Sequence, residues 1–131
     1  MQLLKLEPSN HKPGVLLDAE NNLLQFWGAS FPEDAIAFFS PIVRWMREFC
    51  NLCDEKVKSG SVLNATFNLT YLNSASHRTL LEIFNILKLI LEKGVPVKID
   101  WHYEKNDVRI LESGQELAEL SDMTVNFFEY E

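Results

Sequence analysis

The periodicity of the hydrophobic residues changes abruptly near the middle of the chain, and this change constrains the fold more than any other feature. Residues 61–72 alternate between hydrophobic and polar side chains, which predicts a half-buried β-strand. Between Leu80 and Leu91 the hydrophobic residues recur every three or four positions, which predicts a helix with a wide apolar face. The turn between the two patterns reads Asn-Ser-Ala-Ser at positions 73–76. We therefore expect a strand that leads almost directly into a helix.

This turn has two interpretations that the residues alone leave open. Asn73 and Ser74 stand where a helix needs an N-cap, and capping is the commoner role of such residues. However, the free N–H groups and the dipole of a helix N-terminus also favour negative charge, so a phosphoryl group on a serine here would be stabilised. The turn is thus either a plain helix cap or a site of regulatory phosphorylation.

Similar reasoning predicts further elements on both sides of the turn. The segment Ser30-Phe31-Pro32-Glu33 has the spacing of a capping box and predicts a helix that opens there, with a kink or a new start near Pro41. Gly94 is expected to end the helix that contains Leu80. The other patterns predict strands at residues 1–7, 15–19, 23–28, 95–103 and 125–130, and a last helix at 107–120 that Ser113 and Gly114 should weaken.

The predicted order is β-β-β-α-β-α-β-α-β, in a single domain that spans residues 1–131. Strands and helices alternate in the second half, which predicts parallel strands joined by right-handed crossovers. The first half resembles a hairpin, so we expect an α/β fold with a mixed sheet and helices packed on it. Binding sites in such sheets lie at the carboxyl ends of the parallel strands. This rule brings residues 28–33, 73–76 and 102–107 to one end of the sheet.

The charge balance favours proteins as partners. The chain has 19 acidic and 12 basic residues, and its formal net charge is −7. Binding to a phosphate backbone depends on clustered Lys and Arg, whereas the basic residues here are scattered. We therefore expect neither nucleic-acid nor membrane binding. The N-terminus does not have the pattern of a signal peptide, and no apolar run approaches the roughly 18 residues of a membrane span. The expected location is cytoplasmic.

The two cysteines form a C-x-x-C pair, Cys50 and Cys53, that could indicate redox chemistry or half of a zinc site. A redox pair places its nucleophilic thiol at a helix N-terminus, where the dipole lowers the pKa. Here the pair ends a predicted helix, where the dipole has the opposite effect. Zinc would need two further ligands, and the three histidines show no matching spacing. A structural role is the better interpretation.

Catalysis by this chain is also disfavoured. Ser74, His77 and Asp107 supply the residue types of a catalytic triad, but no G-x-S-x-G nucleophile elbow is present. Glycine-rich phosphate loops are absent too, since the chain has only five glycines. Carboxylates in the first turns of helices more often serve the helix dipole than bind Mg²⁺. We expect no catalytic residues, no cofactor and no metal site; the carboxylates considered for Mg²⁺ are Glu33, Asp34, Glu104 and Asp107.

Four spaced motifs, in the same order over about residues 15 to 130, resemble the SiaC family of bacterial regulatory phosphoproteins. They are Gly28–Asp34, Phe38–Trp45, Tyr71–Ser76 and Trp101–Asp107. The chain departs from the family pattern at three positions. Ala75 replaces the second hydroxyl residue of the turn, His102 replaces an aromatic residue before Tyr103, and Glu104 replaces the usual Asp after it. The resemblance implies a STAS-like fold, similar to that of the anti-sigma-factor antagonists, and a non-enzymatic switch.

The resemblance further implies how the switch works. A partner Ser/Thr kinase would phosphorylate the hydroxyl that follows Asn73, which is Ser74, with Ser76 as the alternative acceptor. A PP2C-like phosphatase would reverse the reaction. The unphosphorylated form would bind and activate an effector, a diguanylate cyclase, and so raise cyclic di-GMP and favour biofilm formation. The surface expected to bind the partner comprises Ser30, Phe31, Glu33, Tyr71, Asn73, Ser76, Tyr103, Glu104 and Asp107.

A second function class stays open, because the same scaffold could bind a small ligand or a lipid. The aromatic residues Phe26, Trp27, Phe31 and Trp101 would then line a pocket. A large closed apolar cavity would favour this alternative. An exposed Ser74 surrounded by a flat, semi-polar surface would favour the phosphorylation switch.

Overall fold

The computed structural model describes residues 1–131 and contains one six-stranded sheet in which the strands follow one another in chain order. The first two strands run antiparallel to their neighbours, and β3 to β6 are parallel to one another. The predicted mixed sheet is therefore confirmed. The strands are β1 (Leu4–Leu6), β2 (Gly14–Asp18), β3 (Leu23–Ser30), β4 (Leu63–Leu72), β5 (Val97–Glu104) and β6 (Val125–Tyr130).

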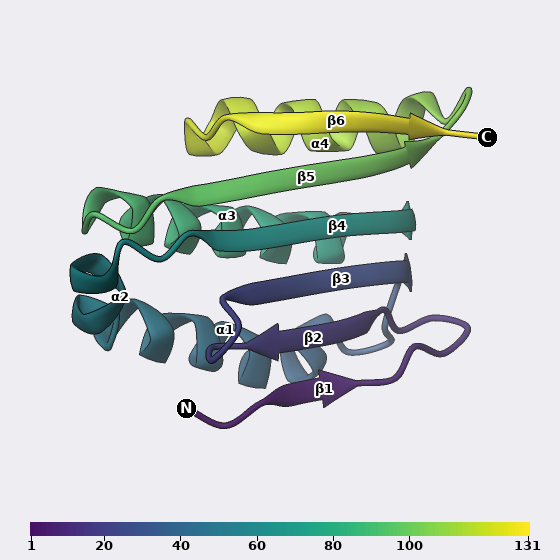
Figure 1. The fold of residues 1–131 in the computed structure, drawn as a ribbon. Helices are drawn as coiled ribbons and strands as arrows, with labels where there is room; N and C mark the ends of the chain where they lie inside the picture. Colours follow the sequence, from purple (N-terminus) through teal and green to yellow (C-terminus); the bar gives the residue numbers. More distant parts are fainter.

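The helices cover only one face of this sheet (Figure 1). Each parallel crossover advances the chain by one strand in the same direction, so the right-handed rule places every crossover helix on the same side. The central helix α3 packs between α1 and α4. The helices are α1 (Ala35–Asn51), α2 (Asp54–Ser59), α3 (Ser74–Glu92) and α4 (Val108–Ser121).

The core lies between the sheet and this helix layer. Phe67 on the central strand β4 stacks on Phe26 with ring centroids 5.0 Å apart, and it also contacts Phe84 and Trp101 at 5.1 and 5.7 Å. These four side chains are at most 2% exposed. Burial of a large apolar side chain contributes about 1.5–3 kcal/mol, so this aromatic cluster is a main source of stability.

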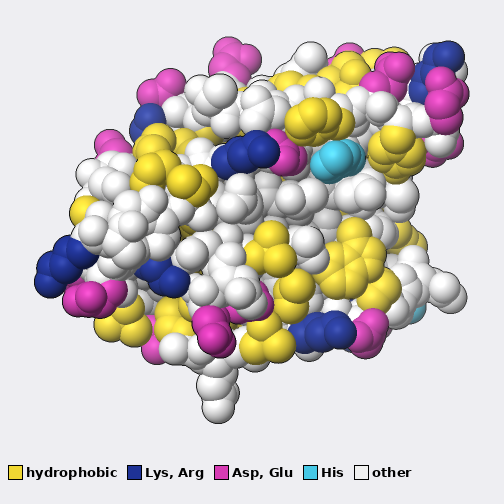
Figure 2. Space-filling view, viewed as in Figure 1, with side chains coloured by type: hydrophobic (Ala, Val, Ile, Leu, Met, Phe, Trp, Pro, Cys, Tyr) yellow, Lys and Arg dark blue, Asp and Glu magenta, His cyan; other side chains and the backbone are white.

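The other face of the sheet has no helix on it, and Figure 2 views the molecule from that side. Its middle row runs across four strands through Gln25, Thr66, Asp100 and Asn126, which are register partners. Parallel strands that are covered on both faces are continuously hydrophobic, whereas these alternate. Because the bare face is exposed to water, hydrophobic and polar residues alternate along these strands, and this alternation allowed the strands to be predicted from the sequence.

The structure corrects the predicted start of the first helix. Ser30 is the last residue of β3 and is buried, so it does not cap a helix. The N-cap of α1 is Asp34, whose Oδ1 accepts the N–H of Ala37 at 3.0 Å. The capping-box prediction was wrong because β3 continues two residues beyond its predicted end. Helix α1 also continues through Pro41 as a single helix instead of starting again there.

Helix α4 is continuous through Gly114, which was expected to weaken it. The glycine has a packing role, because a Cβ atom at this position would lie only 2.7 Å from the indole ring of Trp101. The same indole donates its Nε1–H to the carbonyl oxygen of Ile110 at 3.0 Å. Gly114 therefore allows α4 to lie directly against the central sheet. The short helix α2 was not predicted, but otherwise the order of elements is as expected.

The structure also describes the end of α3, the two cysteines and the apolar character of the helices. Gly94 follows the C-cap of α3 and adopts a positive φ of 111°, as expected of the residue that ends a helix. The cysteines lie at the junction of α1 and α2 as buried free thiols. Burial raises the pKa of the Cys53 thiol, which lowers its reactivity. Among the helices, none combines the length and the apolar character that crossing a membrane requires.

Candidate functional site

The carboxyl ends of β3, β4 and β5 lie at the same end of the sheet, as the parallel pairing requires (Figure 1). The three predicted segments, residues 28–33, 73–76 and 102–107, therefore share this end. The backbone N–H of Asn73 donates to the carbonyl oxygen of Ser30 at 3.1 Å, which joins the first two segments directly. We refer to this end of the molecule, around the start of α3, as the Ser74 pole.

At the centre of the Ser74 pole, β4 leads into α3 without a loop. Asn73 has an extended backbone and is the N-cap of α3, and its Oδ1 accepts the N–H of Ser76 at 2.8 Å. Ser74 is the first helical residue and is exposed. Its hydroxyl makes no hydrogen bond within the protein. Asn73 thus performs the capping that either residue could have performed, and this leaves the hydroxyl of Ser74 free at a helix N-terminus.

Ser76 lies in the opposite environment two residues later. It is fully buried, and its Oγ lies 2.8 Å from the Oγ of Ser30, which is only 1% exposed. This buried pair links the end of β3 to the first turn of α3. Both serines were expected to contribute to the partner surface, but their side chains lie inside the protein and position the turn instead. The burial of Ser76 also argues against it as an acceptor of phosphate.

Exposed aromatic rings stand beside the turn. Phe31 and Tyr71 are 41% and 48% exposed, and they meet edge to face with ring centroids 5.5 Å apart. The ring of His11 lies 5.9 Å from that of Phe31, and the N–H of Phe31 donates to the His11 carbonyl at 2.8 Å. Exposed aromatic side chains of this kind are enriched in protein interfaces.

The loop that carries His11 was missed in the sequence reasoning. It connects β1 to β2, and it lies at the Ser74 pole because β2 runs antiparallel to β3. A surface depression there is lined by His11 and Lys12 from this loop, by residues 32–38, and by Ala75 and Arg78 of α3. The hairpin expected in the first half of the chain could have revealed this, because it places the start of β2 beside the end of β3.

The third segment contributes less to the surroundings of Ser74 than expected. Asp107 is occupied as the N-cap of α4, where its Oδ1 accepts the N–H of Ile110 at 3.1 Å. The shallow groove beside Ser74 is instead bordered by α4, and neither Tyr103 nor Glu104 lines it. Its lining consists of Leu72, Asn73, Ser74, His77, Arg78, Leu81, Ser113, Glu116 and Leu120.

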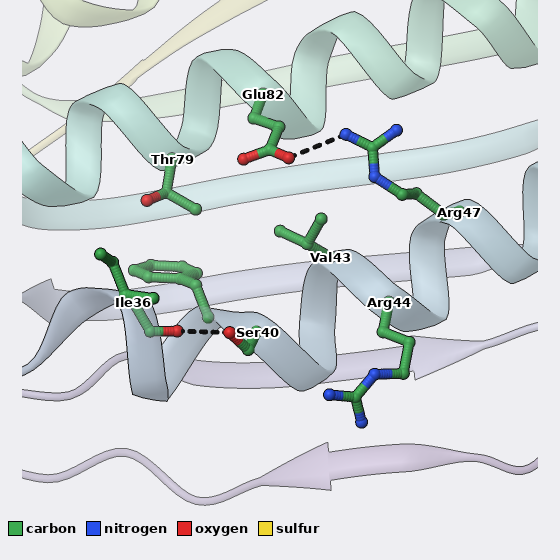
Figure 3. Close-up of a pocket in the computed structure, with 8 residues that line it drawn as sticks. Ile36, Ser40, Val43, Arg44, Arg47, Thr79 and Glu82 are labelled. Carbon is green, nitrogen blue, oxygen red and sulfur yellow. Dashed lines mark hydrogen bonds and ion pairs between the residues drawn. The ribbon is translucent and has the colours of Figure 1, made fainter.

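A second groove runs between α1 and α3 and meets the Ser74 pole at Ile36 (Figure 3). Ile36 is 81% exposed, which is unusual for a large hydrophobic residue. Further along the groove, Arg47 pairs with Glu82 at 2.8 Å, while Arg44 points away from that pair. Ile36 also lines the depression that His11 and Pro32 border, so the two hollows share this exposed apolar side chain.

The carboxylates of the pole are not grouped as metal ligands. Glu33, Asp34, Glu104 and Asp107 form no group that could hold a metal ion, and nowhere in the protein do three or more His, Cys, Asp or Glu side chains form one. Asp34 and Asp107 both serve as helix caps. What remains exposed is one free serine hydroxyl, aromatic rings and a few charged side chains.

Comparison with known proteins identifies relatives of this chain. The sequence matches the model of the SiaC family, described as regulatory phosphoproteins, over residues 6–130. An uncharacterised protein of Pseudomonas aeruginosa strain UCBPP-PA14 is 27% identical over 119 residues, which cover 91% of this chain and 90% of that protein.

Solved structures show the same fold. Apo-SiaC from P. aeruginosa is 25% identical and superposes with a TM-score of 0.83 over 100% of both chains. SiaC in complex with the diguanylate cyclase SiaD, of which it is the activator, gives a TM-score of 0.84 at 24% identity, over 97% of this chain and 99% of that one. The match of the family model along nearly the whole sequence establishes that this chain belongs to the SiaC family of regulatory phosphoproteins.

Proposed function

We propose that this protein is a phosphorylation-controlled activator of a diguanylate cyclase and that Ser74 is the residue whose phosphorylation switches it off. The observation that carries the proposal is the contrast between the two serines of the turn. Ser74 is exposed with a free hydroxyl, whereas Ser76 is fully buried and bonded to Ser30. Only Ser74 can reach the active site of a kinase without local unfolding.

The position of Ser74 explains how the fold would tolerate the modification. A phosphoserine carries about −1.5 to −2 charges at neutral pH. At the first position of α3 this charge faces the positive end of the helix dipole, and the first turn of α3 contains no acidic residue. The side chains of His77 and Arg78 border the same groove, as does the carboxylate of Glu116. The helix dipole and Arg78 would therefore compensate part of the added charge.

The same charge would oppose binding of a partner at the pole. Phe31 and Tyr71 offer an apolar contact next to Ser74. A partner that covers these rings would also remove Ser74 from water, and a doubly charged group is costly to desolvate when the partner supplies no cation. We therefore assign partner binding to the unphosphorylated form.

The proposed partners follow from the family. SiaC of P. aeruginosa is the activator of the diguanylate cyclase SiaD, and we propose an effector of the same class here, with cyclic di-GMP and biofilm formation as the outputs. A partner Ser/Thr kinase would add the phosphate and a PP2C-like phosphatase would remove it. The chain itself would act as a regulator without catalytic activity.

The alternative of a ligand-binding domain gains no support from the positions of the aromatic residues. Phe26 and Trp101 are packed in the core, while Trp27 lies over Gly14. Phe31 is at the Ser74 pole. These four side chains therefore do not line one shared cavity.

Phosphate mapping tests the assignment. The protein is incubated with its cognate kinase and ATP, and its intact mass and phosphopeptides are measured. The wild type and the Ser76→Ala variant should each gain one phosphate, and Ser74→Ala should gain none. Phosphorylation of Ser74→Ala at another serine would show that the acceptor is wrongly assigned.

A further inference from the structure

The two edges of the sheet differ in how well they are protected from pairing with another strand. Unpaired edge strands are templates for association, and proteins protect them by keeping them short or by adding lysine, proline or a bulge. The edge strand β1 has only three residues and carries Lys5, which pairs with Glu7 at 3.6 Å. The segment before it is joined to α1, since the indole N–H of Trp45 donates to the Gln2 carbonyl at 2.8 Å.

The opposite edge strand, β6, lacks these features, and its single charged residue is Glu129. It contains six residues, Val-Asn-Phe-Phe-Glu-Tyr, with no lysine and no proline. It pairs with β5 alone, and the register of that pair has no shift along its length. A regular aromatic strand with a free edge is well suited to pair with another chain.

This strand also carries an exposed aromatic side chain. The side chain of Phe128 is 44% exposed on the face of the sheet that carries no helix. It stacks on His102 of β5, with ring centroids 5.1 Å apart and an angle of 22° between the ring planes. The neighbouring Phe127 lies on the opposite face of the sheet and is partly buried against the core.

We propose that β6 pairs antiparallel with β6 of a second copy of this chain, so that the two six-stranded sheets become one continuous sheet. A two-fold axis perpendicular to the sheet keeps the helices of both copies on the same side. Residues directly opposite each other must then lie on the same face, which requires the axis to pass midway between one residue and the same residue of the second copy. The axis at Phe128 places the two exposed rings opposite each other.

The sequence of β6 is self-complementary in this register. Asn126 lies opposite Tyr130 of the second copy, and Phe127 lies opposite Glu129. Glu129 is the single charged residue of the strand, so no like charges meet across the axis. The stacked rings of His102 and Phe128 in each copy would form one row of four rings across the interface.

Sedimentation of the purified protein, without any effector, tests the dimer and is independent of the proposed switch. The chain has a mass of 15.1 kDa, and we expect the wild type to reach twice that mass as its concentration is raised. Phe128→Lys replaces an aromatic pair by two like charges and should weaken the dimer at least about tenfold. Leu89→Lys is the matched control, because Leu89 is similarly exposed at 49% on α3, and this variant should dimerise like the wild type.

Cross-linking provides a second test that does not depend on a loss of stability. In Phe128→Cys the two new thiols would lie opposite each other on adjacent strands, within the range that a disulfide can bridge. Mild oxidation should rapidly give a covalent dimer, whereas Leu89→Cys should not, and the native Cys50 and Cys53 are buried. The proposal is refuted if the wild type stays monomeric at all concentrations. It is equally refuted if a dimer forms that Phe128→Lys leaves intact and Phe128→Cys does not cross-link.

Discussion

The buried hydrogen bond between Ser30 and Ser76 should show strong energetic coupling. Both hydroxyls are at most 1% exposed, and their oxygen atoms are 2.8 Å apart. Replacing one serine by alanine leaves the other hydroxyl buried without its partner, which costs about 1–3 kcal/mol. Replacing both removes the two polar groups together and can be nearly neutral. We therefore expect the double variant to be more stable than the sum of the single effects predicts.

A double-mutant cycle measures this coupling. Wild type, Ser30→Ala, Ser76→Ala and the double variant are unfolded in urea, and the four free energies of unfolding give the interaction energy. We expect a coupling of at least about 1 kcal/mol, and for a domain of this size each kcal/mol lowers Tm by about 3–5 °C. Additive effects of the two substitutions would refute the view that this pair fixes the turn at Ser74.

Three further predictions concern other parts of the molecule. Gly114→Ala should destabilise the protein by about 1–3 kcal/mol despite the better helix propensity of alanine, because the new Cβ would meet the indole of Trp101 at 2.7 Å; unchanged urea denaturation would contradict this. Because Cys53 is buried and its thiol has a raised pKa, a thiol reagent at pH 8 should label it much more slowly in the native protein than in the unfolded protein. Equal labelling rates would contradict the burial of this thiol. Phe31→Ala and Tyr71→Ala should each lower effector affinity about tenfold or more with little change in Tm, as measured by titration calorimetry. An unchanged affinity would show that these rings lie outside the interface.

The fold was largely predictable because its local signals agree with one another. The polar face of β4 is exposed to water, so its period of two is clear, and Asn73 marks the start of α3. The last strand was predicted with its observed bounds, Val125–Tyr130. Where a competing local signal exists, the prediction failed: Ser30 fits a capping box by spacing, but β3 continues to that residue and buries it. The six-residue helix α2 has no buried residue and therefore no hydrophobic pattern to reveal it.

The site was only partly predictable, because much of it depends on contacts between distant segments. Exposure of Ser74 and burial of Ser76 could have been inferred from the phase of α3, since Ser76 lies one turn before Leu80 on the buried face. The partner of that hydroxyl, Ser30, is 46 residues away and gives no local signal. The contact of Gly114 with Trp101 is equally remote, so the glycine appeared in the sequence only as a weak point of a helix.

The central claim is that a phosphate on Ser74 releases the effector while the fold survives, and the most direct test is cyclase activation by the two forms of the protein. Unphosphorylated protein and protein phosphorylated stoichiometrically by the kinase are each titrated into the cognate diguanylate cyclase, and the rate of cyclic di-GMP synthesis is measured beside the Tm of each form. We predict that the unphosphorylated protein and Ser74→Ala activate the cyclase, and that the phosphorylated protein has lost most of this activity at a similar Tm. Equal activation by both forms, or stronger activation by the phosphorylated form, would contradict the account.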